Sequence, residues 1–124
     1  MPAVAVIYHL AQEADWRAAE AVGEYHVSTR GRTLAEVGFI HCSDAGQVAA
    51  VANRIYSGVT DLVLLAIDPA LLHAEVRYEA APGSAETFPH VYGPLNMDAV
   101  VLVVPFPPDA DGTYTFEEPA GPVA

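Results

Sequence analysis

Three histidines stand at the ends of apolar segments, where a rigid sheet can present side chains to a ligand. His9 lies near the end of the run AVAVIYHLA, His41 ends GFIH, and His90 lies in the proline-bounded FPHVYGP. A buried neutral imidazole needs hydrogen-bond partners for both ring nitrogens. A single histidine in an apolar strand is more often a satisfied core residue, but three in this setting predict one shared cleft.

Two other chemistries can be drawn from the same residues. Three histidines and a water match a catalytic zinc site, but these three come from separate segments without HxH or HxxxH spacing, so we expect no metal. Cys42 is the only cysteine and directly follows His41. Neighbouring strand residues point to opposite faces, so the pair is badly placed for cysteine catalysis, and Cys42 is expected to face the core.

Polar residues after His41 predict the start of a helix. Asp44 can cap it, with Gln47 three residues later completing a capping-box pattern. The same helix start offers free backbone N–H groups and the positive end of the dipole, so a phosphate could bind beside Ser43.

The segment RYE places Tyr78 and Glu79 on opposite faces of a predicted strand. Glu79 is either a catalytic carboxylate or one of many surface acids, and the sequence favours the surface interpretation.

The composition restricts the classes of partner. The chain has 124 residues, is 52% hydrophobic and carries a net charge of −11. A long phosphate backbone would be repelled, so we expect no nucleic acid partner. No apolar run reaches the roughly 18 residues that span a bilayer, and no signal peptide is evident, so no membrane association and a cytoplasmic location are expected.

The positions of the strands follow from hydrophobic periodicity. Alternating residues predict a half-exposed strand at 75–80, and a further edge strand is expected at 112–117. The prolines of FPHVYGPLN instead predict an ordered loop that contains at most a short extended piece. Continuous apolar runs predict buried strands at residues 3–11, 39–41, 61–68 and 98–105.

Two main helices are predicted, one at residues 13–22 and one between Asp44 and Gly58. The second carries an apolar stripe at Val48, Val51, Ala52 and Ile55. These elements predict a single α+β domain over residues 1–118, followed by a flexible tail at residues 119–124.

The chain resembles the bacterial family catalogued as domain of unknown function 952, over residues 6–116. The matching pieces, in chain order, are IYHLA, GFIHCS followed by Gln47, VANRIYSG, DLVLLAID, VRYE, FPHVYGPLN and AVVLVVP. The order of the pieces is also similar to that of the ADP-ribosyltransferase superfamily, in particular its RNA 2′-phosphotransferase branch. This second resemblance implies a split, antiparallel-rich sheet.

The superfamily resemblance also implies roles for individual residues. His9 would hold the nicotinamide ribose of NAD, and His41 and Ser43 would lie beside the nicotinamide and phosphates. A third position, often glutamate, stabilises the developing oxocarbenium ion. That position does not match cleanly here, and Glu79, His90 and Tyr92 are all candidates.

The resulting hypothesis is a transferase or glycohydrolase that acts on NAD, or on a related small nucleotide-like ligand, at a ribose in a histidine-lined cleft. The alternative is a non-enzymatic module that binds a small ligand or a protein through the same cleft. A metal-dependent hydrolase ranks third. The predicted catalytic residues are Glu79, His90 and His41, and the predicted ligand-binding residues are His9, Ser43, Gln47, Tyr78 and Tyr92.

Overall fold

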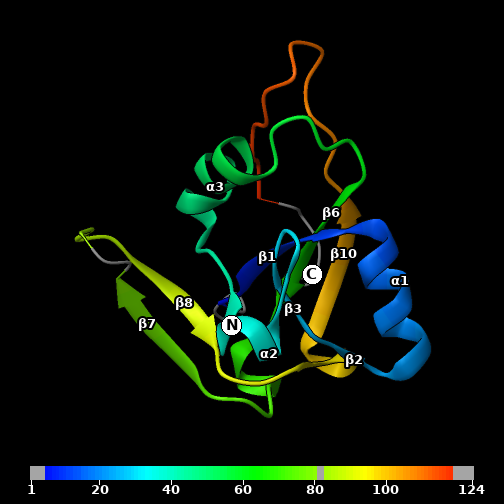
Figure 1. Ribbon diagram of the computed structural model, residues 1–124, viewed down its shortest axis with the longest axis vertical. Helices are drawn as coiled ribbons and strands as arrows, with labels where there is room; N and C mark the ends of the chain where they lie inside the picture. Colours follow the sequence, from blue (N-terminus) through cyan, green and yellow to red (C-terminus); the bar gives the residue numbers. More distant parts are fainter. Residues whose placement is uncertain (1–4, 81–82, 119–124) are drawn as a thin grey trace.

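The computed structural model describes residues 5–80 and 83–118, so the predicted tail at 119–124 lies outside the described residues. The chain forms a single α+β domain with two main helices, and all of its paired strands are antiparallel (Figure 1). The predicted fold class is therefore confirmed.

The larger sheet has the strand order β1-β6-β10, with β1 at Ile7–Gln12, β6 at Leu62–Ile67 and β10 at Val100–Pro105. Every residue of β6 is buried, because both faces of this central strand are covered. Figure 1 shows the helices α1 (Glu13–Val22) and α3 (Val48–Ile55) on opposite sides of the sheet. This two-sided burial explains why the sequence of β6 is apolar throughout and does not alternate.

Local sequence signals correctly predict the end of α1 and the start of the second helix. Gly23 follows α1 in the left-handed conformation, with φ 93°, which glycine adopts without steric cost. The second predicted helix begins with a 3-10 turn, η1 (Ala45–Gln47), before α3. The predicted apolar stripe is correct: Val48, Val51 and Ala52 are buried, and Ile55 packs against the same cluster.

The second sheet has the order β5-β8-β7, with β5 at Ile40–His41, β8 at Thr87–Val91 and β7 at Val76–Ala80. The β7–β8 hairpin extends away from the larger sheet (Figure 1). Two backbone hydrogen bonds between Tyr8 and Ser43, both 2.8 Å, join the two sheets.

FPHVYGPLN was predicted as an ordered loop with at most a short extended piece, but its first four residues belong to the five-residue strand β8. The carbonyl oxygen of Pro89 accepts a hydrogen bond from the Cys42 amide at 3.0 Å. Pro89 has no amide hydrogen to return that bond, and β5 ends one residue earlier, at His41. The proline therefore limits the length of the neighbouring strand but does not prevent β8 from forming.

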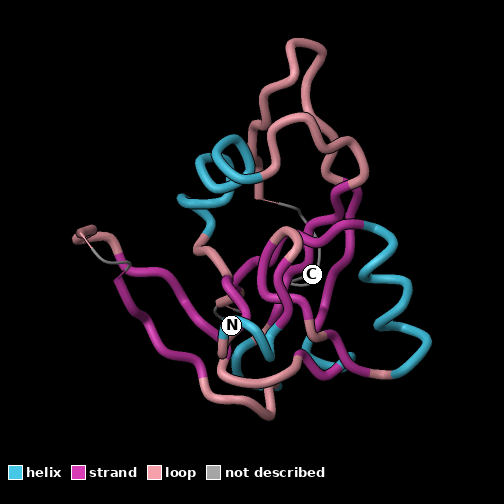
Figure 2. Tube along the Cα trace, in the orientation of Figure 1, coloured by secondary structure: helices cyan, strands magenta, loops and turns pink. Residues whose placement is uncertain are grey.

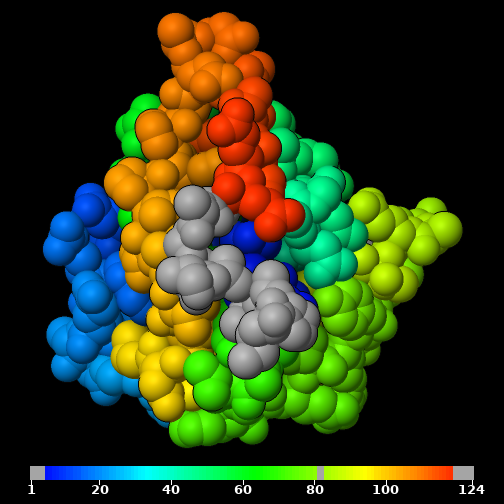
Figure 3. All heavy atoms as spheres, turned by 180° about the vertical axis from the view of Figure 1, so that it is seen from behind, coloured from blue at the N-terminus to red at the C-terminus, as the bar shows by residue number. Residues whose placement is uncertain are grey.

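The prediction of an edge strand at residues 112–117 is wrong. Figure 2 shows this segment as loop, and Figure 3 shows its last described residues beside α3. The Tyr114 amide donates to Asn53 Oδ1 at 2.8 Å, and Asn53 Nδ2 donates to the Tyr114 carbonyl at 2.9 Å. The Tyr114 hydroxyl also donates to the Val59 carbonyl. Side-chain hydrogen bonds thus take the place of a strand ladder.

Short elements complete the domain. They are β2 (Glu24–Tyr25) paired with β9 (Leu95–Asn96), β3 (Val27–Thr29) paired with β4 (Arg32–Thr33), the single-turn helix α2 (Leu34–Val37), and the 3-10 turns η2 (Pro69–Leu71) and η3 (Met97–Ala99). Within the described residues, no helix is both long enough and apolar enough to cross a membrane.

Candidate functional site

Two cavities adjoin at His41. The first cavity has a volume of about 420 Å³ and is lined by Phe39, His41, Arg54, Glu79, Ala80, Phe88, His90 and Tyr92. The second cavity has a volume of about 330 Å³ and is lined by Ser28, Thr29, Arg32, Val37, Phe39, His41, Arg54 and Ile55. Because they share three residues, the two cavities form one cleft.

Strand periodicity explains how the second sheet builds the first cavity. Glu79 pairs with Phe88, and His41 pairs with His90, so these side chains share one face of the sheet. On the other face, Ile40 and Val91 are fully buried in the core. Cys42, directly after β5, is fully buried in the same core cluster, and burial raises the pKa of its thiol, so the prediction that it faces the core is confirmed.

Glu79 accepts two hydrogen bonds at the wall of the first cavity. Tyr92 Oη donates to Glu79 Oε1 at 2.5 Å, and His90 Nδ1 donates to the same oxygen at 2.8 Å. These bonds, from the tyrosine first and the histidine second, lower the pKa of the Glu79 carboxyl. Glu79 is therefore ionised at neutral pH, and His90 has its Nδ1 protonated, which leaves Nε2 as an acceptor when the ring is neutral.

Aromatic contacts hold this group in place. The ring of Phe39 stacks on His90 with centroids 3.9 Å apart and an interplanar angle of 12°. The Arg77 guanidinium lies over the Tyr92 ring, 4.4 Å from its centroid. Both His90 and Tyr92 are thus packed from one side while they hold Glu79 from the other, which favours a fixed carboxylate position.

His41 lies at the junction of the two cavities with its imidazole free of protein hydrogen bonds within residues 5–80 and 83–118. Burial lowers its pKa to about 4, and the nearby His90 and Arg54 contribute to the same shift. The ring is therefore neutral at physiological pH, and it offers one donor and one acceptor to a ligand.

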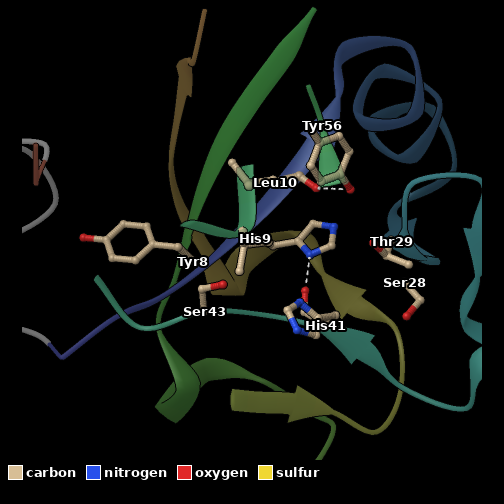
Figure 4. Close-up of a pocket in the computed structure, with 9 residues that line it drawn as sticks. Tyr8, His9, Leu10, Ser28, Thr29, His41, Ser43 and Tyr56 are labelled. Atoms are coloured by element: carbon tan, nitrogen blue, oxygen red, sulfur yellow. Dashed lines mark hydrogen bonds between the residues drawn. The ribbon is translucent and has the colours of Figure 1, made fainter. Parts of the chain in front are cut away.

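His9 lines neither cavity of the cleft, but it lines a small adjoining pocket of about 10 Å³ together with His41 (Figure 4). Its Nδ1 donates to the His41 carbonyl at 2.7 Å, and its Nε2 accepts from the Tyr25 hydroxyl at 2.8 Å. Burial lowers the pKa of His9 to about 4. Both ring nitrogens of His9 are therefore bonded within the protein, and His9 positions the backbone of His41. The predicted contact between His9 and a ribose stays a prediction.

The remaining predicted binding residues lie away from both cavities. Ser43 is buried in the strand bridge to Tyr8 and lines only the same pocket of about 10 Å³. Gln47 Oε1 accepts from the Asp44 amide at 3.0 Å, so the helix start is partly closed to an anion. The exposed Tyr78 donates to Asp44 Oδ1 at 2.8 Å from the opposite face of β7.

The structure therefore brings together four of the predicted residues and adds others. His41, Glu79, His90 and Tyr92 meet in the first cavity, whereas His9, Ser43, Gln47 and Tyr78 do not line it. Sequence reasoning missed Phe39, Phe88, Arg32 and Arg54. Reading 87–91 as a strand would have placed Phe88 on the face of His90. Within the described residues, no group of three or more histidine, cysteine, aspartate or glutamate side chains could hold a metal ion.

Acidification is expected to destabilise the fold through His41. Its native pKa of about 4 lies below the ordinary 6.5, so the unfolded chain takes up the proton first. The contribution of the His41 imidazole to the free energy of unfolding is complete above about pH 7. It falls as the pH drops and stops changing below about pH 4. In the wild type, His41 should account for roughly 2 kcal/mol of the decrease in unfolding free energy between about pH 7 and pH 5. The His41→Asn variant should lack this part of the decrease.

Urea unfolding at the two pH values measures this effect. His26→Asn, at an exposed position, is the matched control and should keep the wild-type acid sensitivity. A His41→Asn variant as acid-sensitive as the wild type would contradict a buried neutral imidazole.

Comparison with known proteins finds one matching family model and solved structures of the same fold. A family model described as protein of unknown function (DUF952) matches residues 10–103. The crystal structure of CC0527 from Caulobacter crescentus has a TM-score of 0.77 and 34% sequence identity, over 89% of this chain and 93% of that chain. Its solution NMR structure has a TM-score of 0.75 at 34% identity, over 90% and 92%. No curated protein matches the chain.

Proposed function

Since this chain belongs to the DUF952 family of proteins of unknown function, we propose its activity from its own cleft: it binds NAD or a related nucleotide and acts at a ribose, as a transferase or glycohydrolase. The cleft combines apolar walls with a few convergent polar groups, as small-molecule sites do. The first cavity alone, at about 420 Å³, is within the size range of such sites.

The fixed, ionised Glu79 carries this proposal. When a nicotinamide leaves its ribose, positive charge develops on the sugar, and a preorganised carboxylate stabilises that charge. Glu79 is held by Tyr92 and His90 before any substrate arrives, so it needs little reorganisation during the reaction. Of the three candidates for the third superfamily position, Glu79 is the one with this charge.

The neighbouring groups fit a nucleotide-like substrate. The neutral His41 can donate to one ribose hydroxyl and accept from another, because neither of its ring nitrogens has a partner in the described part of the chain. Phe39 and Phe88 offer aromatic surface for a base or a nicotinamide ring. The resemblance of the chain order to the ADP-ribosyltransferase superfamily supports the same substrate.

The buried position of His9 favours a second candidate, a non-enzymatic module that binds a small ligand or a protein. In the superfamily, the first-strand residue contacts the substrate ribose, whereas here both nitrogens of His9 bond within the protein. A cleft that lacks this contact can still bind a ligand without promoting its cleavage.

Two measurements on the wild-type protein test the proposal and separate the candidates. Isothermal titration calorimetry with NAD and with ADP-ribose should detect saturable binding of both. An assay of nicotinamide release should then detect NAD cleavage above the buffer rate. Binding without release would support the binding module, and no binding of either ligand would exclude the nucleotide proposal.

A further inference from the structure

The second cavity has a positive lining in a strongly acidic chain. Arg32 from β4 and Arg54 from α3 both line it, although the chain has 16 acidic residues against five arginines. Neither guanidinium forms a salt bridge or a hydrogen bond with any described residue. Two guanidiniums without bonded partners beside one cavity form a local site for an anion despite the overall charge.

The other three arginines have protein partners. Arg17 pairs with Glu13 at 2.9 Å, Arg77 pairs with Glu75 at 3.0 Å, and Arg30 donates to the Ile55 carbonyl at 3.0 Å. The two arginines of the second cavity therefore differ from these three, whose guanidiniums already bind protein groups.

Glu36 interacts with the charge of Arg32 but forms no salt bridge with it among the described residues. Glu36 lies close enough for Arg32 to contribute to lowering its pKa, behind the larger effect of hydrogen bonds from Thr33. Glu36 Oε1 accepts from the Thr33 amide at 2.8 Å and from the Thr33 hydroxyl at 3.2 Å. This carboxylate is thus committed to capping α2.

A buried hydroxyl at the same cavity also lacks a partner. Ser28 is fully buried, and its Oγ is the single buried side-chain polar atom without a hydrogen bond among the described residues. Buried hydroxyls are almost always paired, so an unpaired one at a cavity wall points to a partner from outside the chain. Ser28 lines both the second cavity and the small pocket beside His41, where Figure 4 shows Ser28 and Thr29.

We propose that the second cavity is a phosphate subsite, and that the ligand of the whole cleft is a phosphorylated ribose compound. Arg32 and Arg54 bind the phosphate oxygens, with the hydroxyl of Ser28 at the inner wall, and the sugar extends past His41 toward Glu79. Two guanidiniums and a hydroxyl offer more donors than the two oxygens of a carboxylate accept well, and they suit the three terminal oxygens of a phosphate. The direction of the sugar rests on the function proposed above, whereas the phosphate site does not.

Binding of inorganic phosphate, ribose 5-phosphate and ribose tests the subsite. In calorimetric titrations at low ionic strength, ribose 5-phosphate should bind about tenfold more tightly than inorganic phosphate, and ribose alone should not bind measurably. Arg32→Gln and Arg54→Gln should each weaken both phosphate ligands by about tenfold, since each removes a charge-assisted contact. Arg54→Lys, which keeps the charge, should recover part of that loss.

Matched controls separate this subsite from general electrostatics. Arg17→Gln removes the same charge from an exposed position on α1 and should leave both affinities unchanged. Because both cavity arginines are exposed, their replacement is expected to preserve the fold, which thermal unfolding verifies. Ser28→Ala gives an independent variant that should weaken ribose 5-phosphate without a change in net charge.

The outcomes distinguish the subsite from the proposed reaction. Glu79→Gln should retain inorganic phosphate binding, since Glu79 lines only the first cavity. If the wild-type protein binds phosphate but does not cleave NAD, the phosphate subsite is supported and only the proposed reaction is contradicted. No saturable binding of either phosphate ligand, or equal loss in Arg17→Gln and Arg54→Gln, would overturn the subsite. Equal affinities for inorganic phosphate and ribose 5-phosphate would overturn the assigned ligand class.

Discussion

Replacing Glu79 by glutamine is expected to reduce the rate of NAD cleavage by about 100- to 1,000-fold, the range found for loss of one preorganised electrostatic contact. Glutamine keeps the size of the side chain and can still accept a hydrogen bond from Tyr92. It lacks the negative charge that stabilises the cationic sugar. The loss should appear mainly in kcat, because the charge matters more in the transition state than in the bound substrate.

The nicotinamide-release assay measures this change, and Glu20→Gln is its matched control. Glu20 is an exposed acid on α1, so its replacement makes the same change in net charge away from the first cavity. The control should retain wild-type kcat. A Glu79→Gln variant that cleaves NAD as fast as the wild type would show that this carboxylate is not the catalytic charge.

Leu65→Ala is expected to cause the largest loss of stability, about 2–5 kcal/mol in the free energy of unfolding. Leu65 is fully buried in the central strand β6, where it pairs with His9 on one side and Val103 on the other. Truncation leaves a cavity between the sheet and α1, because packed neighbours relax only partly. Since Leu65 adjoins His9, the loss should also loosen the support of His41.

Urea unfolding measures this loss, and Leu71→Ala provides a control with the same chemical change. Leu71 is 46% exposed in η2, so its truncation should change the unfolding free energy by less than about 0.5 kcal/mol. Similar losses at both positions would contradict the assignment of β6 as the centre of the core.

The sequence alone predicted several elements well. The helix at residues 13–22 has the observed bounds, and Gly23 ends it as expected. The strands β6 and β10 lie within the predicted ranges, and β6 is buried as predicted. Strand β10 was also predicted to be buried, but it is an edge strand whose residues are half-buried or exposed. These successes share a cause, since the signals are local: an apolar run, a periodic stripe or a glycine beyond a helix end acts within a few residues.

Two errors show where local signals fail. The prolines of FPHVYGPLN indicated a loop with at most a short extended piece, but the full strand β8 forms because Pro89 uses its carbonyl toward Cys42 and needs no amide there. Residues 112–117 looked like a strand, but Asn53 pairs with the backbone of Tyr114 instead. In both segments, a partner far away in the chain decided the conformation.

The sequence also determined which residue types were present for chemistry, including the candidates His41, Glu79, His90 and Tyr92. Only the tertiary structure decided which of them meet. The register of β5, β8 and β7 brings these four side chains to one cavity, whereas His9 is buried and bonds to the His41 carbonyl and the Tyr25 hydroxyl. The physical reason is that strand pairing and burial depend on contacts between distant segments, which no local pattern specifies.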